Sequence, residues 1–241
     1  MKFFSLVCVF LAAMHFSDAK VDYTSYAELL HKYVQADGVS YDVWAGQHAD
    51  VAALNAVLAE WAQISVAELS ADEQKAFYIN LYNAGMLQAV LERYPIKSVK
   101  DIGLIPFSIF KKNYIQLMDR SLSLDNIEKG ILLKDFPDPR IHFAVNCASV
   151  SCPPLRAEPY RAKQLDQQLE AQTRLFAASD HAARVNVSKQ RTAYSELFKW
   201  YASDFAVTNP ALFLNRYRSE PLPIEHTVIW IDYDWSLNQS Q

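Results

Sequence analysis

The sequence predicts an α+β fold in which a predominantly helical single domain surrounds a small β-sheet. Apolar residues recur at helical spacing along much of the chain, and a few short stretches are typical of strands. No internal repeat, low-complexity segment or linker divides the 241 residues, which suffice for one sizeable core. We therefore expect one domain that contains both kinds of element.

Six helices are predicted, and the most clearly bounded one follows Ser70. The Ser70 hydroxyl and the Glu73 carboxylate can form a capping box, and Pro95 ends this helix. Gly38 is a typical C-terminal cap for the first helix, and Ser123 or Asp125 can cap the fourth. The predicted helices, marked by apolar residues at helical spacing, are 26–34, 52–61, 70–91, 127–132, 165–176 and 195–205.

The best candidate for a buried strand is the apolar stretch 141–145, which follows a turn cluster at 135–139. Alternation of apolar and polar residues predicts a second strand over 227–233. The remaining predictions are a hairpin of 114–118 and 120–124 turning at Asp119, short extended segments at 39–41 and 184–187, and a loop at 101–106.

Residues 1–19 match the pattern of a cleavable secretory signal peptide. Lys2 precedes an apolar run over 3–14, and Ser17 and Ala19 occupy the small-residue positions before the cleavage site. The run holds about a dozen residues, fewer than the roughly 20 that cross a hydrocarbon core, so we expect no stable membrane span. An uncleaved anchor or a buried N-terminal helix is the alternative. We expect an exported protein, periplasmic or secreted, with 20–241 as its globular domain.

The charge of the chain argues against a nucleic-acid partner. The formal net charge of −4 survives removal of the signal, because Lys2 and Asp18 leave together. Nucleic-acid binding requires clustered Lys and Arg, whereas the pairs Lys111-Lys112 and Arg216/Arg218 are typical of solvated surface. A small molecule or a peptide is the expected partner.

Two cysteines remain after loss of Cys8 with the signal, and they allow two exclusive interpretations. An oxidising compartment favours a structural disulfide between Cys147 and Cys152. Their alpha carbons can approach only if the chain bends, and Pro153 and Pro154 restrict that bend. Alternatively, one cysteine is a nucleophile, and a disulfide would then make both unavailable in the resting state.

The residue types needed to activate a thiol are present. His142 precedes Cys147 by five residues, Asn80 and Asn83 lie one turn apart on the predicted helix, and Ser149 and Ser151 surround the bend. An imidazole can lower the pKa of a thiol, and an amide can orient the imidazole. The two Asn side chains can equally hold neighbouring backbone.

Metal and redox chemistry are weaker hypotheses. Cys147, Cys152 and His142 could supply three zinc ligands, but the usual spacing of two residues between cysteines is absent. Redox pairs also usually have two intervening residues, whereas this pair has four. We predict no metal and no cofactor.

Five blocks of the sequence stand out in order along the chain: 77–84, 140–147, 151–155, 198–205 and 233–238. Together they resemble the domain of unknown function 547 family, over about residues 41–238. The resemblance implies that the family's recurrent polar positions are Asn80, Asn83, Glu128, His142, Cys147, Ser151 and Cys152. Members occur in exported bacterial proteins and, with an N-terminal coiled coil, in plants.

One residue departs from the pattern of that family. Lys129 follows Ile127-Glu128, where the family often has His. If that His were a catalytic base, His142 would have to serve in this chain, or the chain would be a binding variant. Membership in the family implies no particular activity.

Two hypotheses of function follow. The first is a thiol-dependent hydrolase or acyl-transfer enzyme. Its catalytic candidates are Cys147, Cys152, His142, Asn80 and Asn83, and its binding candidates are Glu128, Ser149 and Ser151. The second is a non-enzymatic periplasmic or secreted binding module, in which the cysteines form a disulfide and the other residues form a satisfied polar core.

Overall fold

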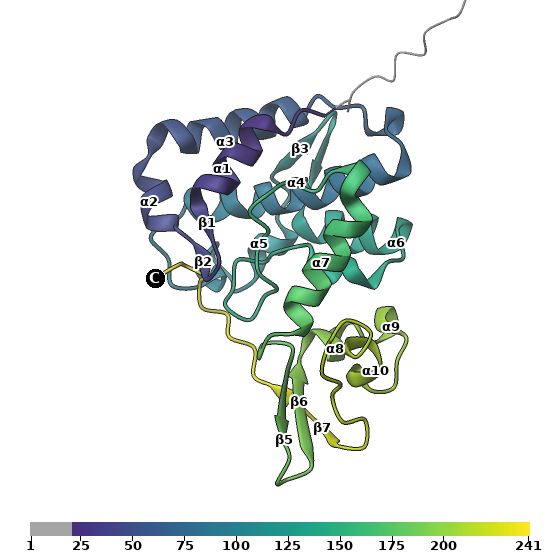
Figure 1. Ribbon diagram of the computed structural model, residues 1–241. Helices are drawn as coiled ribbons and strands as arrows, with labels where there is room; N and C mark the ends of the chain where they lie inside the picture. The colour runs from purple at the N-terminus through teal and green to yellow at the C-terminus, as the bar shows by residue number, and fades with distance from the viewer. Residues whose placement is uncertain (1–20) are drawn as a thin grey trace, which may run out of the picture.

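The computed structural model describes residues 21–241 (Figure 1). It confirms the predicted α+β class, with about 48% helix and only small sheets. The predicted signal peptide at 1–19 lies outside the described residues. Within residues 21–241, no helix combines the length and apolar character needed to span a bilayer.

Short helices and turns connect a few longer helices. The α-helices are α1 (Thr24–Tyr33), α2 (Tyr41–Gly46), α3 (His48–Trp61), α4 (Ala71–Leu91), α5 (Ser108–Lys111), α6 (Leu133–Asp135), α7 (Leu165–Ala177), α8 (Leu197–Trp200), α9 (Ala202–Phe205) and α10 (Pro210–Leu214). The 3-10 helices are η1 (Val66–Glu68), η2 (Val99–Asp101), η4 (Pro139–Phe143) and η5 (Ala162–Gln164), and η3 (Asn126–Leu132) is a π-helix.

Three small sheets are present in the described part of the chain. Two are antiparallel hairpins, of β1 (Val34–Gln35) with β2 (Gly38–Val39) and of β3 (Ile115–Leu117) with β4 (Arg120–Leu122). In the third, β6 (Arg191–Ser195) pairs antiparallel with β5 (Ala183–Asn186) and parallel with β7 (Thr227–Ile231). The predicted hairpin at 114–124 and the predicted strand at 227–233 are therefore confirmed.

Helix α4 runs through the centre of the main core, among α2, α3, η3 and η5. Its predicted capping box is present, because the Ser70 hydroxyl accepts from the Glu73 amide and the Glu73 carboxylate accepts from the Ser70 amide. The helix is buried from Ala76 almost to its end, as expected of a helix that is apolar on all sides. It holds Asn80 and Asn83 in the interior.

The predicted strand at 141–145 is wrong, because this segment belongs to the 3-10 helix η4. Pro139 occupies its first turn, and the Asp138 side chain accepts a hydrogen bond from the Arg140 amide. With three residues per turn, successive side chains leave a 3-10 helix in three directions. Ile141 therefore enters the main core, and Phe143 enters a second aromatic cluster beside the β5–β6–β7 sheet. A strand would have offered only two faces.

The segment 195–205 is also different from the prediction of one continuous helix. The helices α8 and α9 are separated at Tyr201, whose φ of −115° and ψ of 31° are not helical. Strand β6, which was not predicted, precedes them, and its residues Thr192 and Tyr194 are buried. The interruption turns the chain, so that Phe198 and Phe205 both reach the second aromatic cluster.

The C-terminal residues return from β7 across the molecule to the N-terminal hairpin (Figure 1). Isolated β-bridges join Ser236 to Ser98, Leu237 to Ser149, and Gln239 to Val39. Gly38 is not the cap of α1, which ends at Tyr33. A Cβ on Gly38 would lie 2.3 Å from the carbonyl oxygen of Asn238, so the residue permits the close approach of this tail. We call residues 233–240 the C-terminal tail.

Candidate active site

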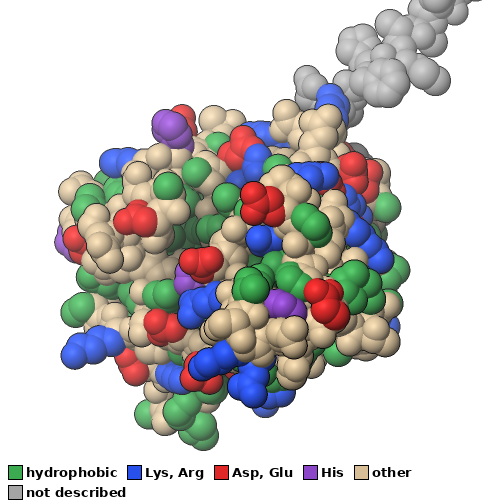
Figure 2. Space-filling model, turned by 60° about the horizontal axis from the view of Figure 1, so that its bottom comes forward, with side chains coloured by type: hydrophobic (Ala, Val, Ile, Leu, Met, Phe, Trp, Pro, Cys, Tyr) green, Lys and Arg blue, Asp and Glu red, His purple; other side chains and the backbone are tan. Residues whose placement is uncertain are grey.

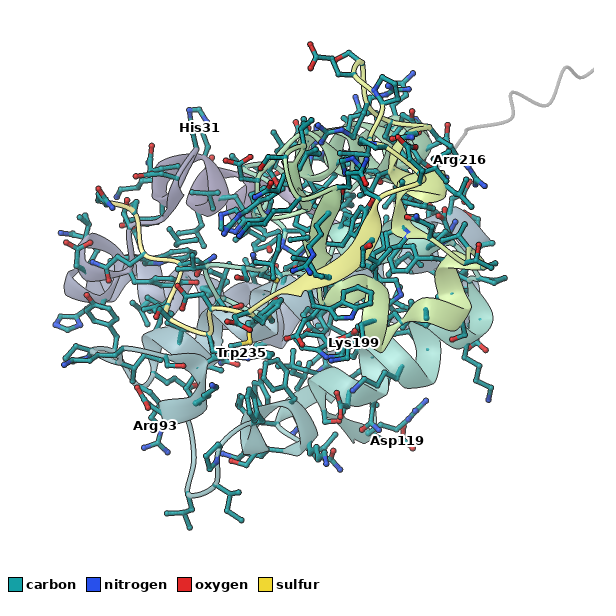
Figure 3. The ribbon with its side chains drawn as sticks, turned by 90° about the horizontal axis from the view of Figure 1, so that it is seen from below. His31, Arg93, Asp119, Lys199, Arg216 and Trp235 are labelled. Atoms are coloured by element: carbon teal, nitrogen blue, oxygen red, sulfur yellow. The ribbon has the colours of Figure 1, made fainter. Side chains whose placement is uncertain are left out.

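A cavity of about 440 Å³ lies where η3, η4, α5, α8 and the C-terminal tail meet, which is a size typical of small-molecule sites. Its lining is mainly aromatic and apolar, with a few charged groups. The lining residues are Tyr82, Phe107, Phe110, Lys111, Asp125, Glu128, Lys129, His142, Val145, Cys147, Cys152, Pro153, Leu197, Trp200, Tyr201, Tyr233 and Trp235. Figure 3 shows Trp235 and Lys199 near the middle of the underside of the molecule.

Cys147 lies at the wall of this cavity, partly exposed, at a sharp turn after η4. Its sulfur is 3.0 Å from the Ser149 hydroxyl and 3.4 Å from the Tyr233 hydroxyl. The next residue, Ala148, has a φ of 58°, a left-handed conformation that is unfavourable for a residue with a Cβ. The turn therefore holds the sulfur between two hydroxyl groups.

Cys152 is buried beside Cys147, and both are free thiols. The Cys147 amide donates a hydrogen bond of 3.0 Å to the Cys152 sulfur, and the Cys152 thiol donates to the Val145 carbonyl oxygen over 3.9 Å. The bend required by the sequence spacing is therefore present. The disulfide stays a prediction for oxidising conditions.

The two thiols differ in their tendency to ionise. Burial acts to raise the pKa of Cys147, but hydrogen bonds from Cys152, Ser149 and Tyr233 together outweigh it and hold this pKa below its ordinary value. Burial, followed by the contact with Cys147, raises the pKa of Cys152 well above its ordinary value. Cys147 is therefore the thiolate-forming member of the pair.

His142 is buried in the cavity wall with its Nε2 atom 2.9 Å from Oδ2 of Asp204. Beside a carboxylate, Nε2 carries the proton and donates it, which leaves the Nδ1 lone pair for proton transfer. Burial lowers the pKa of His142, partly offset by Asp204 and Glu128, so the ring is neutral near pH 7. Among the described residues, no hydrogen bond joins His142 to either sulfur.

Glu128 places a buried carboxylate in the same cavity, with 7% of its surface exposed. Its Oε1 atom accepts a hydrogen bond of 2.7 Å from the Tyr201 hydroxyl, and the Tyr201 ring packs on the His142 ring at 4.1 Å between centroids. Glu128 lies in the π-helix η3, a form of helix that is frequent at functional sites. No cationic side chain forms an ion pair with it within residues 21–241.

The two Asn side chains predicted to be catalytic hold backbone instead and do not line the cavity. Asn83 donates to the Ala144 carbonyl oxygen at 2.9 Å and accepts from the Asn146 amide at 2.8 Å. Asn80 makes the same pair of bonds with the two polar backbone groups of Tyr160. Asn83 therefore positions the turn that carries Cys147, and Asn80 anchors a segment further away.

The two predicted binding serines have separate positions. Ser149 is buried and contacts the Cys147 sulfur directly. Ser151 holds the C-terminal tail, because its hydroxyl accepts from the Asp234 amide at 2.9 Å and its own amide donates to the Asp234 carbonyl oxygen. Ser151 thus acts on the cavity through the tail that carries Tyr233.

Lys129, at the position where the resembling family often has His, lines the cavity and pairs with Asp125 at 2.9 Å. It is exposed at the rim and lies one residue after the buried Glu128. His142 is therefore the imidazole that lines this cavity.

Sequence reasoning missed Asp204 and Tyr233 as members of the site. Both residues belong to the blocks that carry the family resemblance, so the signal was available, but neither has a local pattern that predicts contact with His142 or Cys147. Within the described residues, no group of three or more His, Cys, Asp or Glu side chains is arranged to hold a metal ion.

The fold and the site define an α+β protein with a pair of cysteines at the wall of an aromatic cavity. Residues 66–177 match the family described as "Protein of unknown function, DUF547". The match is shorter than the resemblance over 41–238 and excludes the blocks at 198–205 and 233–238. No curated protein and no solved structure was found to match the chain.

Proposed function

We propose that the protein is a thiol-dependent enzyme that hydrolyses or transfers an acyl group, with Cys147 as its nucleophile. The observation that carries this proposal is the environment of one sulfur. Cys147 is held by the hydroxyl groups of Ser149 and Tyr233, and it opens on a cavity that also contains a neutral, Asp-bound His142. Thiolate stabilisation together with a nearby imidazole is the arrangement that thiol catalysis requires.

The reaction proceeds in two stages. The Cys147 thiol gives its proton to His142, its sulfur bonds to the acyl carbon, and the bond from that carbon to the leaving group breaks. The leaving group takes the proton from His142. His142 then accepts a proton from water, whose oxygen attacks the thioester carbon. The carbon–sulfur bond breaks and His142 returns the proton to the Cys147 sulfur, so that the products are a carboxylic acid and the free thiol. An amine or alcohol in place of water gives acyl transfer.

The lining of the cavity indicates a small molecule or a short peptide with an apolar portion. Trp200 and Trp235 stack with 5.9 Å between ring centroids, and Tyr233 packs against both. Glu128 is the buried anion of the site, and its second carboxylate oxygen can accept a hydrogen bond from a ligand. A ligand with a cationic or hydrogen-bond-donating group beside its apolar portion would match both the Glu128 carboxylate and the aromatic lining.

Export of the protein is part of the proposal and depends on residues 1–19. In an oxidising compartment the cysteine pair would need a reductant to stay active, because a bond between the two sulfurs removes the nucleophile. The proposal therefore includes a reduced working state.

A non-enzymatic binding module is the second candidate, and one contact favours it. The 3.0 Å contact between the Cys147 amide and the Cys152 sulfur shows that the bend brings the pair together, as a structural disulfide requires. In that case the aromatic cavity would bind a ligand without reacting with it.

Thiol counting followed by intact-mass analysis distinguishes the two candidates. We expect two titratable thiols in the native processed protein and, with p-nitrophenyl acetate, one acetyl group on Cys147. Cys147→Ala should abolish the adduct, whereas Cys152→Ala should retain it. Absence of free thiols until reductant is added would exclude a resting nucleophile, and absence of an adduct on the reduced protein would leave the binding module.

A further inference from the structure

Two aliphatic side chains protrude at the tip of the loop between η2 and α5. Leu104 is 103% exposed and Ile105 is 70% exposed, the first and third highest values among the exposed large hydrophobic residues of the described chain. Pro106 beside them is exposed as well. Figure 2 shows hydrophobic side chains protruding at the lower edge of the molecule, with Lys and Arg side chains nearby. Contact of such a tip with water is unfavourable.

Both ends of this loop are fixed, so the tip is presented by an ordered turn. Ile102 and Ile109 are buried on either side of it. The Ser108 amide donates to the Ile105 carbonyl oxygen at 3.0 Å, and the Ser108 hydroxyl donates to the Ile102 carbonyl oxygen at 3.4 Å. Phe107 has a φ of 66°, which is unfavourable for residues other than glycine. This conformation turns the chain into α5.

The chain segment that carries the tip has a charge opposite in sign to that of the whole chain. Residues 93–112 contain five basic residues and one acidic residue, a net charge of +4, in a chain whose net charge is −4. The acidic residue, Asp101, accepts hydrogen bonds from the Lys97 and Ser98 amides. The basic residues are Arg93, Lys97, Lys100, Lys111 and Lys112, and all but the partly buried Lys100 are exposed.

We infer that this loop, residues 102–107 with its basic flanks, docks the protein on the surface of a bilayer that contains anionic lipid. Exposed aliphatic side chains enter the boundary between headgroups and acyl chains, while neighbouring lysines contact the anionic headgroups. The tip is convex and small, so a bilayer can accommodate it without a preformed pocket. A protein partner would need a groove of matching shape.

The position of the loop joins this surface to the cavity. Phe107 and Phe110 line the cavity, and Lys111 lies on its rim. The Lys100 ammonium group lies 5.3 Å from the centre of the Phe107 ring and 5.7 Å from the centre of the Trp235 ring. One basic residue therefore contacts both the loop and the cavity lining. Docking through this loop would bring the mouth of the cavity to the bilayer.

Vesicle sedimentation of the processed chain tests the inference. Vesicles of phosphatidylcholine alone are compared with vesicles of equal parts phosphatidylcholine and phosphatidylglycerol, at low and high salt. We expect binding to the anionic vesicles that weakens with salt. The double variant Leu104→Ser/Ile105→Ser and the double variant Lys111→Gln/Lys112→Gln should each bind about tenfold more weakly.

The chain offers matched controls for both variants. Val187 is 74% exposed beside strand β5, so Val187→Ser removes an exposed aliphatic side chain elsewhere. Lys189→Gln/Arg191→Gln removes two exposed basic side chains elsewhere. Neither control should change vesicle binding, and thermal unfolding of all variants checks that they fold.

Three results would overturn the inference. The first is that the protein binds neutral and anionic vesicles equally well. The second is that the Leu104→Ser/Ile105→Ser variant binds as tightly as the wild type. The third is that the control variants lose as much binding as the loop variants. Sedimentation velocity without lipid adds a fourth. If the wild type self-associates and the loop variant does not, the tip is a contact between copies. Catalytic activity is not a readout, so the result is independent of the proposed reaction.

Discussion

The Tyr233 hydroxyl lies 3.4 Å from the sulfur of Cys147, a residue 86 positions earlier in the chain. Tyr233 reaches this position because the C-terminal tail is paired with Ser98, Ser149 and Val39 along its course. The ionisation of the candidate nucleophile therefore depends on a distant segment of the sequence.

Removal of this hydroxyl should make Cys147 harder to ionise. In Tyr233→Phe, loss of one hydrogen bond to the thiolate should raise the pKa of Cys147. The pH dependence of alkylation by iodoacetamide measures this shift. Tyr194→Phe is a matched control, because the Tyr194 hydroxyl is buried without a hydrogen-bond partner and lies in the β5–β6–β7 sheet. An unchanged alkylation profile in Tyr233→Phe would contradict the assignment.

Substitution of Asn80 and of Asn83 should distinguish a local effect on Cys147 from a general loss of stability. Either Asn→Ala substitution leaves a buried backbone donor and acceptor unsatisfied, so each should lower the free energy of unfolding by about 2 to 4 kcal/mol. Only Asn83→Ala should also alter the alkylation rate of Cys147, because Asn83 holds the turn at 144–146. Urea denaturation and alkylation rates measure the two effects. Equal alkylation changes in Asn80→Ala would show that the effect is not local.

Acidification should destabilise the protein through His142. Burial holds the folded-state pKa of this residue below its ordinary value of 6.5. At a pH between the folded-state pKa and 6.5, the unfolded chain therefore binds a proton that the folded chain does not. Stability is therefore retained above about pH 6.5 and decreases as the pH falls towards the lowered pKa. His142→Asn should reduce this decrease, measured by urea denaturation at about pH 7.5 and about pH 5.5. The same substitution at the exposed His31, labelled in Figure 3, should leave the loss of stability at low pH unchanged.

Neutralising Glu128 should lower the pKa of His142 further. The carboxylate of Glu128 acts to raise that pKa, and Glu128→Gln removes its charge while keeping an oxygen that can accept from Tyr201. Titration of the imidazole signals by NMR, assigned with His142→Asn, measures the change. The comparison variant Glu225→Gln alters an exposed acid outside the cavity. A rise in the His142 pKa, or no change, would be inconsistent with this electrostatic coupling.

Substitution of Gly38 should loosen the C-terminal tail. An added Cβ would meet the Asn238 carbonyl oxygen at 2.3 Å, whereas a Cβ on Gly46 would meet nothing within 4 Å. Gly38→Ala should therefore destabilise the protein by about 1 to 3 kcal/mol and slow alkylation of Cys147 near neutral pH, while Gly46→Ala should be close to neutral. Thermal unfolding and alkylation rates measure both effects. Loss of stability without any effect on Cys147 would show that Tyr233 stays in place independently.

Elements with strong local signals could be predicted from the sequence, and those defined by long-range contacts could not. Ser70 and Glu73 define the start of α4 through local chemistry, so the predicted capping box is confirmed. The apolar segment 141–145 has the composition of a buried strand, but Ile141 and Phe143 belong to different core clusters, and a 3-10 turn reaches both. Local composition carries no information about the number of cores nearby.

The candidate site shows the same division. Cys147, Cys152, His142 and Glu128 line one cavity, as residue types and family resemblance together indicated. The roles of Asn80 and Asn83 could not be chosen in advance, since an amide that orients a base and one that holds backbone have the same sequence signature. Asp204 contacts His142 across 62 positions and lies in α9, just after the interruption at Tyr201.

The return of the C-terminal tail also sets the order in which the site is completed during synthesis. Cys147 and Cys152 are made more than 80 residues before Tyr233, so a growing chain carries both thiols before the hydroxyl that stabilises one of them exists. Until residues 233–240 pair with Ser149 and Val39, the nascent chain lacks this means of favouring ionisation at Cys147 over Cys152. Shortening the tail should therefore produce a folded body with a poorly reactive thiol pair.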